Sequence, residues 1–214
     1  MARKKLTRSP NSTILIVTSN QSSALYFSQM RKDCRYSNLN VEWCDKYKDL
    51  VDFINQAARL RSHGNYTVVW ALFDFDDMHA TADEVKAVLS FAEQRKVNLA
   101  WNNPSQSLWY LLHFQTPIGV VSESRVIDDA LANNFVPHYK TGAEYLLTDG
   151  LSFHLSLFPN KSKAANNASS YNAMAEKATG LAATNLILLF NDITRVCGPA
   201  DVTHNQRQLG LKKN

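Results

Sequence analysis

The chain has 214 residues, of which 45% are hydrophobic and 20% are charged, and its formal net charge is +4. This composition is ordinary for a globular protein, and the length predicts one large domain or one domain with an appendage. Three scattered cysteines exclude a disulfide framework and a zinc site with the usual spacing. No apolar run approaches the roughly 18 residues of a membrane helix, so we expect a cytoplasmic protein without membrane contact.

The first 114 residues alternate between strand and helix patterns, after a basic arm predicted at residues 1–12. β-Branched and aliphatic runs predict the strands, and apolar residues at three- and four-residue spacing predict the helices. The alternation predicts an α/β fold with a mostly parallel central sheet and helices on both faces. The predicted strands are 13–18, 39–44, 67–74 and 97–101. The predicted helices are 22–35, 49–61 and 105–114, and a further helix begins at the capping-box pair Thr81 and Glu84.

The second half of the chain is less regular and mainly helical in pattern. A helix is predicted at 124–131, and another at 184–197 ends at Gly198-Pro199. The polar segment 160–170 suits either an exposed loop or a weak helix start. We expect one domain at 13–198, divided into a core sheet at 13–114 and a helical extension at 115–198, with a polar tail at 199–214.

The clearest candidate site is the acidic turn Asp74-Phe75-Asp76-Asp77, directly after the strand predicted at 67–74. In open α/β sheets, ligands bind at the carboxyl ends of the strands. If the segment stays extended, Asp74 and Asp76 point to the same side and can hold Mg²⁺ or Mn²⁺, with Asp77 as an auxiliary ligand. The alternative is an acidic loop that only caps the following helix.

His113 and Asn103, which both follow the fourth predicted strand, each have a functional and a structural interpretation. His113 is expected on an apolar helix face, where it can be a catalyst or a satisfied structural histidine. Asn103 precedes Pro104 and can contact a ligand, although we favour a cap for the helix predicted at 105–114.

Basic residues at two places are candidates for nucleic-acid contact. Arg3, Lys4 and Lys5 lie in the predicted arm, and Lys140 lies in the second half. Lysine and arginine bind nucleic acid through its phosphate charges, but solvated surface residues have the same pattern. The sequence contains no Gly-rich phosphate loop, so we do not expect ATP binding by that route.

Several segments between residues 3 and 195 follow one another in a recognisable order. They are Arg3-Lys4-Lys5, Thr13-Ile14-Leu15-Ile16-Val17, Tyr26-Phe27, the run from Trp70 to Asp77, Asn103-Pro104, Leu108-Trp109, Leu111-Leu112-His113-Phe114 and Tyr139-Lys140. Taken together, these segments resemble the RloB-like family. The resemblance implies a Toprim-like fold, a role in bacterial phage defence by abortive infection, and a Mg²⁺-dependent nuclease-like centre. It also implies nucleic acid as the substrate and an SMC- or ABC-type ATPase as a partner, and it is compatible with an oligomer.

The sequence departs from the family pattern at two acids. The Toprim pattern has a Glu just after the first strand, where this chain has Thr18-Ser19-Asn20-Gln21-Ser22-Ser23 without a carboxylate. The family usually has another Glu inside the helix that follows Asn103-Pro104, where this chain has Ser107. Neither an amide nor a hydroxyl acts as a carboxylate base near neutral pH. We therefore expect a weak or inactive nuclease with Asp74, Asp76 and His113 as catalytic candidates. The alternative is an inactive subunit that binds nucleic acid or docks on an ATPase.

Overall fold

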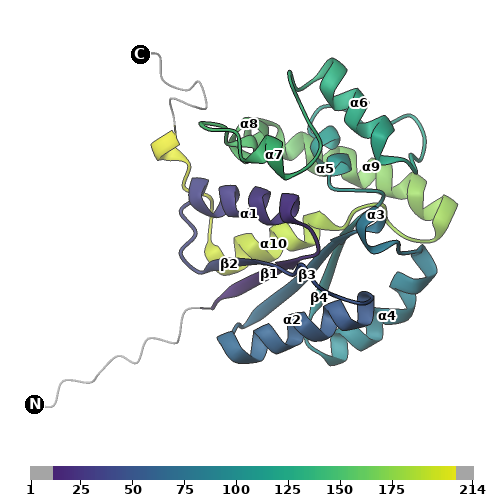
Figure 1. The fold of residues 1–214 in the computed structure, drawn as a ribbon. Coiled ribbons are helices and arrows are strands. Elements are labelled where there is room, and N and C mark those ends of the chain that lie inside the picture. Colours follow the sequence, from purple (N-terminus) through teal and green to yellow (C-terminus); the bar gives the residue numbers. More distant parts are fainter. Residues whose placement is uncertain (1–11, 206–214) are drawn as a thin grey trace, which may run out of the picture.

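The computed structural model describes residues 12–205, which are built around four parallel strands with helices on both sides (Figure 1). The strand order is β2-β1-β3-β4, so β1 and β3 are interior. This confirms the predicted α/β class, the parallel sheet and the interior position of both strands, and it is consistent with a Toprim-like fold. The strands are β1 (Ile14–Thr18), β2 (Leu39–Trp43), β3 (Val68–Asp74) and β4 (Asn98–Asn102).

The apolar run of β1 serves both faces of the sheet. Ile14 and Ile16 belong to one hydrophobic cluster and Leu15 and Val17 to another, because successive side chains of a strand point to opposite faces. All four side chains are completely buried. A strand covered on both faces must be apolar throughout, and this explains why the sequence shows a continuous run rather than an alternating one.

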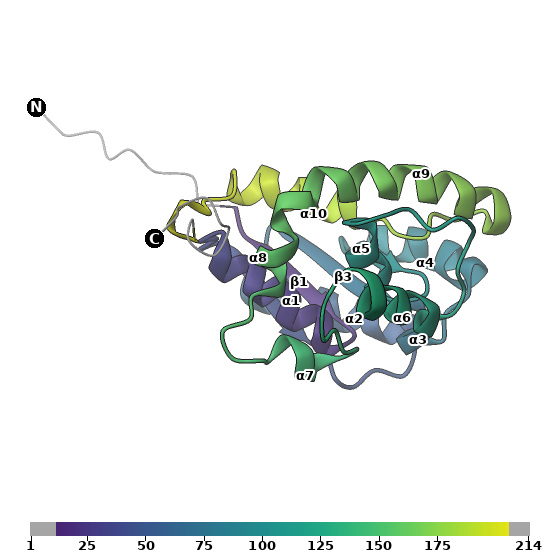
Figure 2. The same cartoon turned by 90° about the horizontal axis from the view of Figure 1, so that it is seen from above.

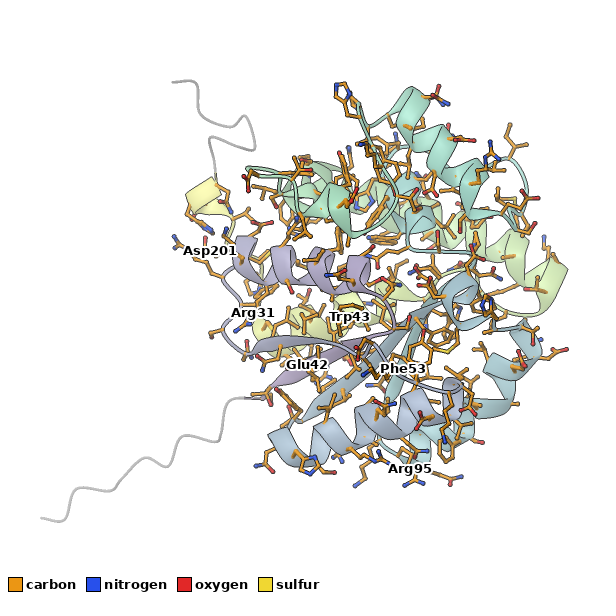
Figure 3. The ribbon with its side chains drawn as sticks, viewed as in Figure 1. Arg31, Glu42, Trp43, Phe53, Arg95 and Asp201 are labelled. Atoms are coloured by element: carbon orange, nitrogen blue, oxygen red, sulfur yellow. The ribbon has the colours of Figure 1, made fainter. Side chains whose placement is uncertain are left out.

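Two helices cover each face of the sheet. On the face of Ile16 lie α1 (Gln21–Asp33) and α10 (Leu186–Cys197), and on the other face lie α2 (Leu50–Gly64) and α4 (Ala82–Gln94) (Figure 1). Phe53 of α2 is fully buried on that second face (Figure 3). Helix α10 therefore returns to the sheet late in the chain and packs beside α1, where the rings of Phe27 and Phe190 are stacked.

The remaining helices form a further layer beyond α1 and α10, as Figures 1 and 2 show from two directions. Within this layer, α5 contacts α6 and α9. The layer is joined to the helices on the sheet where α7 and α8 contact α1. The short helix α3 (Phe75–Met78) follows β3 directly, and the short 3-10 turn η2 (Thr203–Asn205) follows α10. The layer consists of α5 (Ser107–Leu112), α6 (Ser124–Asn134), α7 (Ala143–Leu146), α8 (Phe153–Leu157), η1 (Phe158–Asn160) and α9 (Lys161–Thr179).

Local sequence signals explain where several helices begin. Thr81 Oγ1 accepts a hydrogen bond from the Glu84 backbone at 3.3 Å, and Glu84 Oε2 accepts one from the Thr81 backbone at 2.8 Å. This confirms the predicted capping box at the start of α4. The segment 160–170 forms the start of α9, where Ala164 and Ala168 are buried at four-residue spacing.

One expectation about a helix start is wrong. Helix α5 begins after Gln106, so Asn103 is not its cap. The intervening residues belong to the turn that follows β4, which delays the helix. At the end of α2, Gly64 is the last helical residue and Asn65 adopts the left-handed conformation, with φ of 53°. Asparagine tolerates this conformation better than most residues, so it can stop a helix as glycine does.

Candidate functional site

Polar side chains gather where β1, β3 and β4 end at the same edge of the sheet. Asp74 is the last residue of β3 and lies in register with Asn102, the last residue of β4. Asn20 follows β1, the other neighbour of β3, and is the N-cap of α1. Because parallel strands end at a common edge, the sheet by itself brings these three side chains together.

The Asp74 carboxylate is buried and accepts hydrogen bonds from three N–H groups. Asn102 Nδ2 donates to Oδ1 at 3.0 Å, and the Gln106 backbone and Asn20 Nδ2 donate to Oδ2 at 2.9 and 3.2 Å. Asn102 is oriented in turn by Thr184, whose hydroxyl donates to its Oδ1 at 2.9 Å. Thr184 lies two residues before the first residue of α10, so the second half of the chain helps to fix the site.

Asn20 connects Asp74 to a second carboxylate. Its Oδ1 accepts a hydrogen bond from the Ser23 backbone at 2.7 Å and caps α1. The amide nitrogen must therefore face the other way, where it donates to Asp74 at 3.2 Å and to Asp77 at 2.7 Å. One N–H₂ group thus stands between two carboxylates.

The pairing of the aspartates differs from the one expected for an extended segment. The chain turns into helix α3 directly after Asp74, so the extended premise for Asp74 and Asp76 is wrong. Residues three apart share a helix face, and this brings Asp77 rather than Asp76 beside Asp74. The Asp76 carboxylate instead accepts a hydrogen bond from the Ser124 hydroxyl at the start of α6.

The crowded carboxylates hold their protons more tightly than usual. Burial raises the pKa of Asp74 to about 7, against the hydrogen bonds that favour its charged form, and the charge of Asp77 adds to the increase. The pKa of Asp77 is also raised, first by burial and then by Asp76. Asp74 therefore takes up a proton near neutral pH, as expected for a carboxyl group that burial removes from water.

The three aspartates line one cavity of about 260 Å³. Its opposite wall comes from the segment before and within α7 and includes Lys140, Gly142 and Tyr145. Lys140 is exposed and is the one cationic side chain among the described residues that line this cavity. We call this space, with Asp74 at its base, the Asp74 cavity.

A second polar chain crosses the wall of the Asp74 cavity. The Ser107 hydroxyl and the Tyr139 hydroxyl are 2.9 Å apart, and Tyr139 donates to Asp128 Oδ1 at 3.4 Å. Burial raises the pKa of Tyr139 far above its usual value, so its hydroxyl stays protonated at neutral pH. Asp128 is therefore linked to the cavity, but only through a neutral hydroxyl.

One comparison with known proteins identifies a family for this chain. Residues 14–195 match the family model described as RloB-like protein. The chain belongs to the RloB-like family. No curated protein and no solved structure shows significant similarity to it. Within residues 12–205, no helix is long and apolar enough to cross a membrane.

The resemblance led us to expect a Glu within residues 18–23 and another at Ser107, and both Asn20 and Ser107 line the Asp74 cavity. Asn20 bonds to Asp74, and Ser107 lies on the cavity wall. No carboxylate replaces them directly: of the acids in the second half, Asp128 reaches Tyr139, whereas Glu123 and Glu144 are exposed and are absent from the described lining. In the described part of the chain, no three His, Cys, Asp or Glu side chains are grouped to hold a metal ion.

Two carboxylates, rather than three grouped ligands, are enough for a Mg²⁺-type ion at this site. Mg²⁺ is commonly held by one or two carboxylates together with water and substrate phosphate. Asp74 and Asp77 both lie within hydrogen-bond distance of one atom, Asn20 Nδ2, so they form the pair that suits such an ion. The two carboxylates would hold the ion and supply negative charge to it, in place of the hydrogen bonds that they now accept from the Asn20 amide.

Other residues predicted for the site lie elsewhere. His113 lines a different cavity, where its Nδ1 bonds the Trp109 carbonyl at 2.9 Å, so the structure does not bring it to Asp74. Asn103 lines a shallow neighbouring pocket with Asp76. The basic residues Arg3, Lys4 and Lys5 lie outside the described residues.

Sequence reasoning missed several polar residues of the Asp74 cavity. Asn102 could have been found, because it ends a strand next to Asp74 in a parallel sheet. Gln106 acts through its backbone N–H, and Ser124 lies 48 positions from Asp76, so no local pattern reveals either contact.

Proposed function

We propose that this RloB-like protein acts in bacterial phage defence and handles nucleic-acid phosphodiesters at the Asp74 cavity with a divalent cation. The observation that supports this most is the convergence of Asp74, Asp76 and Asp77 on one cavity at the carboxyl ends of the strands. Open α/β sheets bind ligands at this edge. The relation to Toprim nucleases and to abortive infection rests on the family resemblance.

Asp74 and Asp77 are the proposed cation ligands, and Asp76 lies beside them. A bound Mg²⁺ or Mn²⁺ would supply the positive charge that a phosphodiester reaction requires. Burial is the main cause of the raised pKa values of Asp74 and Asp77, and a bound cation would favour the charged form of both carboxyl groups. Lys140 on the opposite wall offers a second positive charge to a phosphate.

The wall of the Asp74 cavity also contains buried polar side-chain atoms that lack a hydrogen-bond partner within residues 12–205. Among the described residues, Gln106 Nε2, Ser105 Oγ and the Tyr110 hydroxyl have no hydrogen-bond partner, and all three residues line the Asp74 cavity. An unsatisfied buried polar group costs free energy, which a polar ligand can recover. Phosphate and sugar oxygens are ligands of this kind.

We expect the isolated chain to be a weak nuclease. Proton transfer in phosphodiester hydrolysis calls for a positioned base, and Asn20 and Ser107 cannot act as one near neutral pH. Losing such a group typically lowers the rate ~10²- to 10⁴-fold. The protonated Tyr139 does not replace it, because its raised pKa leaves no basic oxygen.

A separate ATPase of the SMC or ABC type is the proposed partner. The family is often encoded beside such an enzyme, and the sequence has no Gly-rich phosphate loop of its own. Co-expression from the native locus followed by affinity capture should recover the ATPase. Repeated capture without any ATPase would contradict the pairing.

The second candidate function is that of an inactive subunit that binds nucleic acid or docks on the ATPase. The position of Asn20 favours it, because its amide already donates hydrogen bonds to both Asp74 and Asp77 without a metal. In this case the Asp74 cavity is a hydrogen-bonded structural feature.

Incubation of the purified chain with single- and double-stranded DNA, RNA and tRNA, in Mg²⁺ and in Mn²⁺, separates the two functions. We expect slow cleavage that Asp77→Asn abolishes and that the matched exposed variant Asp83→Asn retains. Retention of nucleic acid in a mobility-shift assay without cleavage, with or without the ATPase, would support the inactive subunit. Rapid cleavage by the isolated chain would contradict the weak-activity proposal.

A further inference from the structure

A second, larger cavity lies away from the Asp74 cavity, between the outer helices and the layer on the sheet. It has a volume of about 460 Å³ and shares no lining residue with the Asp74 cavity. Helices α1, α5, α9 and α10 contribute to its walls. This volume lies within the range of small-molecule sites, which is about 300–1,000 Å³.

Aromatic rings form much of the wall. The rings of Trp109 and Phe190 are stacked, with centroids 5.0 Å apart and planes at 27°. Tyr26, Tyr36 and Phe158 add further rings to the lining. We call this space the aromatic cavity. Flat aromatic molecules bind well to such walls, because stacked and edge-to-face ring contacts add to the gain from burial.

Two histidines line this cavity, and one of them, His113, presents an acceptor atom in this apolar setting. His113 Nδ1 lies 2.9 Å from the Trp109 carbonyl oxygen, which can only accept, so Nδ1 carries the proton. His154 Nδ1 lies 3.0 Å from Asp33 Oδ2, and the same reasoning places its proton there. Burial lowers the pKa of His113 to about 4, so its Nε2 is an acceptor at neutral pH. Among residues 12–205, neither Nε2 has a hydrogen-bond partner.

Lys161 is the one lysine or arginine among the described residues that line the aromatic cavity. Lys161 is the first residue of α9 and is exposed, and its Nζ lies 4.5 Å from the centre of the Phe158 ring. No carboxylate side chain belongs to the described lining. The charge of the cavity therefore suits an anionic group rather than a cationic one.

We propose that the aromatic cavity binds a flat aromatic small molecule that carries one N–H or O–H donor and one anionic group. The rings of Trp109 and Phe190 contact the aromatic part, His113 Nε2 accepts from the donor, and Lys161 meets the anion. This site is separate from the proposed nuclease centre, so the ligand is an effector or a second substrate rather than the phosphodiester at Asp74.

Two fluorescent probes with the same ring system test the proposal. Anilinonaphthalene sulfonate has the rings, one N–H donor and an anion, and N-phenyl-1-naphthylamine lacks only the anion. The folded wild-type chain should bind one equivalent of each. Lys161→Gln should weaken the sulfonate about threefold, the size of an exposed charge pair, and leave the neutral probe unchanged.

A cavity-filling variant locates the binding. Ala165 of α9 lines the aromatic cavity, and Ala165→Leu should weaken both probes about tenfold or more by occupying the space. Ala173→Leu adds the same side chain to an exposed position of α9 and should have no effect. If Ala165→Leu does not fold by circular dichroism, Ser162→Leu, also in the lining, replaces it. Wild-type affinity in a folded cavity-filling variant, or no binding by the wild type, would overturn the proposal.

Discussion

The Asp74 cavity and the aromatic cavity are stabilised in different ways. The Asp74 cavity is held by N–H groups that converge on carboxylates, with donors from Asn20, Asn102 and the backbone of Gln106. The aromatic cavity is lined by stacked rings such as Trp109 and Phe190. Hydrogen bonds to carboxylates depend on proton and cation concentrations, whereas ring packing depends mainly on buried area. Changes of pH and of cation concentration should therefore act mainly on the Asp74 cavity, and the loss of a ring mainly on the stability of the fold.

The largest predicted effect concerns stability and the aromatic cavity. Trp109→Ala removes a buried ring from the stack and should lower the free energy of unfolding by about 3–5 kcal/mol. Urea unfolding measures it. The control is Trp43→Ala at a tryptophan that is 47% exposed, for which we expect a loss of less than about 1 kcal/mol. Equal losses in the two variants would show that the ring stack does not stabilise the fold.

The next effect concerns cation affinity at the Asp74 cavity. Asn20→Asp keeps a good N-cap for α1 but places a third carboxylate between Asp74 and Asp77. Mn²⁺ binding, followed by calorimetry, should strengthen about tenfold or more, because an amide donor is replaced by an oxygen ligand. Asn20→Ser also keeps the cap, and without an added carboxylate it should gain much less. Unchanged Mn²⁺ affinity in Asn20→Asp would mean that this amide does not limit cation binding.

A pH dependence of similar size follows from Asp74. Its pKa is raised to about 7, so below pH 7 a proton competes with the cation for the carboxylate. Apparent Mn²⁺ affinity should therefore be about tenfold weaker at pH 6 than at pH 8. In Asp74→Asn the residual binding should vary less over this range. A wild-type affinity that is flat between these pH values would contradict the role of Asp74 as a ligand.

The smallest effect concerns the Ser107, Tyr139 and Asp128 chain. Tyr139→Phe removes one buried hydroxyl and should cost about 1 kcal/mol of unfolding free energy. Tyr145→Phe is the matched control, since no hydrogen bond of the Tyr145 hydroxyl is found within residues 12–205. Nuclease activity should be unaffected by Tyr139→Phe, because a neutral phenol is not the missing base. A large loss of cleavage in this variant would assign Tyr139 a catalytic role.

The sheet could be predicted from the sequence because its signals are local. The continuous apolar runs at β1 and β3 indicate strands buried on both faces, and the structure places both inside the sheet. The capping pair Thr81 and Glu84 likewise identified the start of α4. The small apolar stripe of α9 was harder to recognise, because Ala164 and Ala168 lie among polar residues.

The site was only partly predictable because its geometry depends on turns and long-range contacts. The acidic turn was found, but the extended premise failed when the chain entered α3 after Asp74. The contact between Ser124 and Asp76, and the orientation of Asn102 by Thr184, join residues 48 and 82 positions apart. No spacing rule reaches over such distances. His113 was paired with the aspartates on the family motif, whereas the fold directs it to the aromatic cavity.

Calorimetric titration of Mn²⁺ at pH 8 tests the central proposal, a cation site at Asp74 and Asp77, most directly. The wild-type chain should bind one ion, and the double variant Asp74→Asn/Asp77→Asn should lose that binding while keeping its circular dichroism spectrum. Asp83→Asn, at an exposed aspartate outside the cavity, should bind as the wild type does. Equal Mn²⁺ binding by the wild type and the double variant, or no binding by the wild type, would contradict the proposed site.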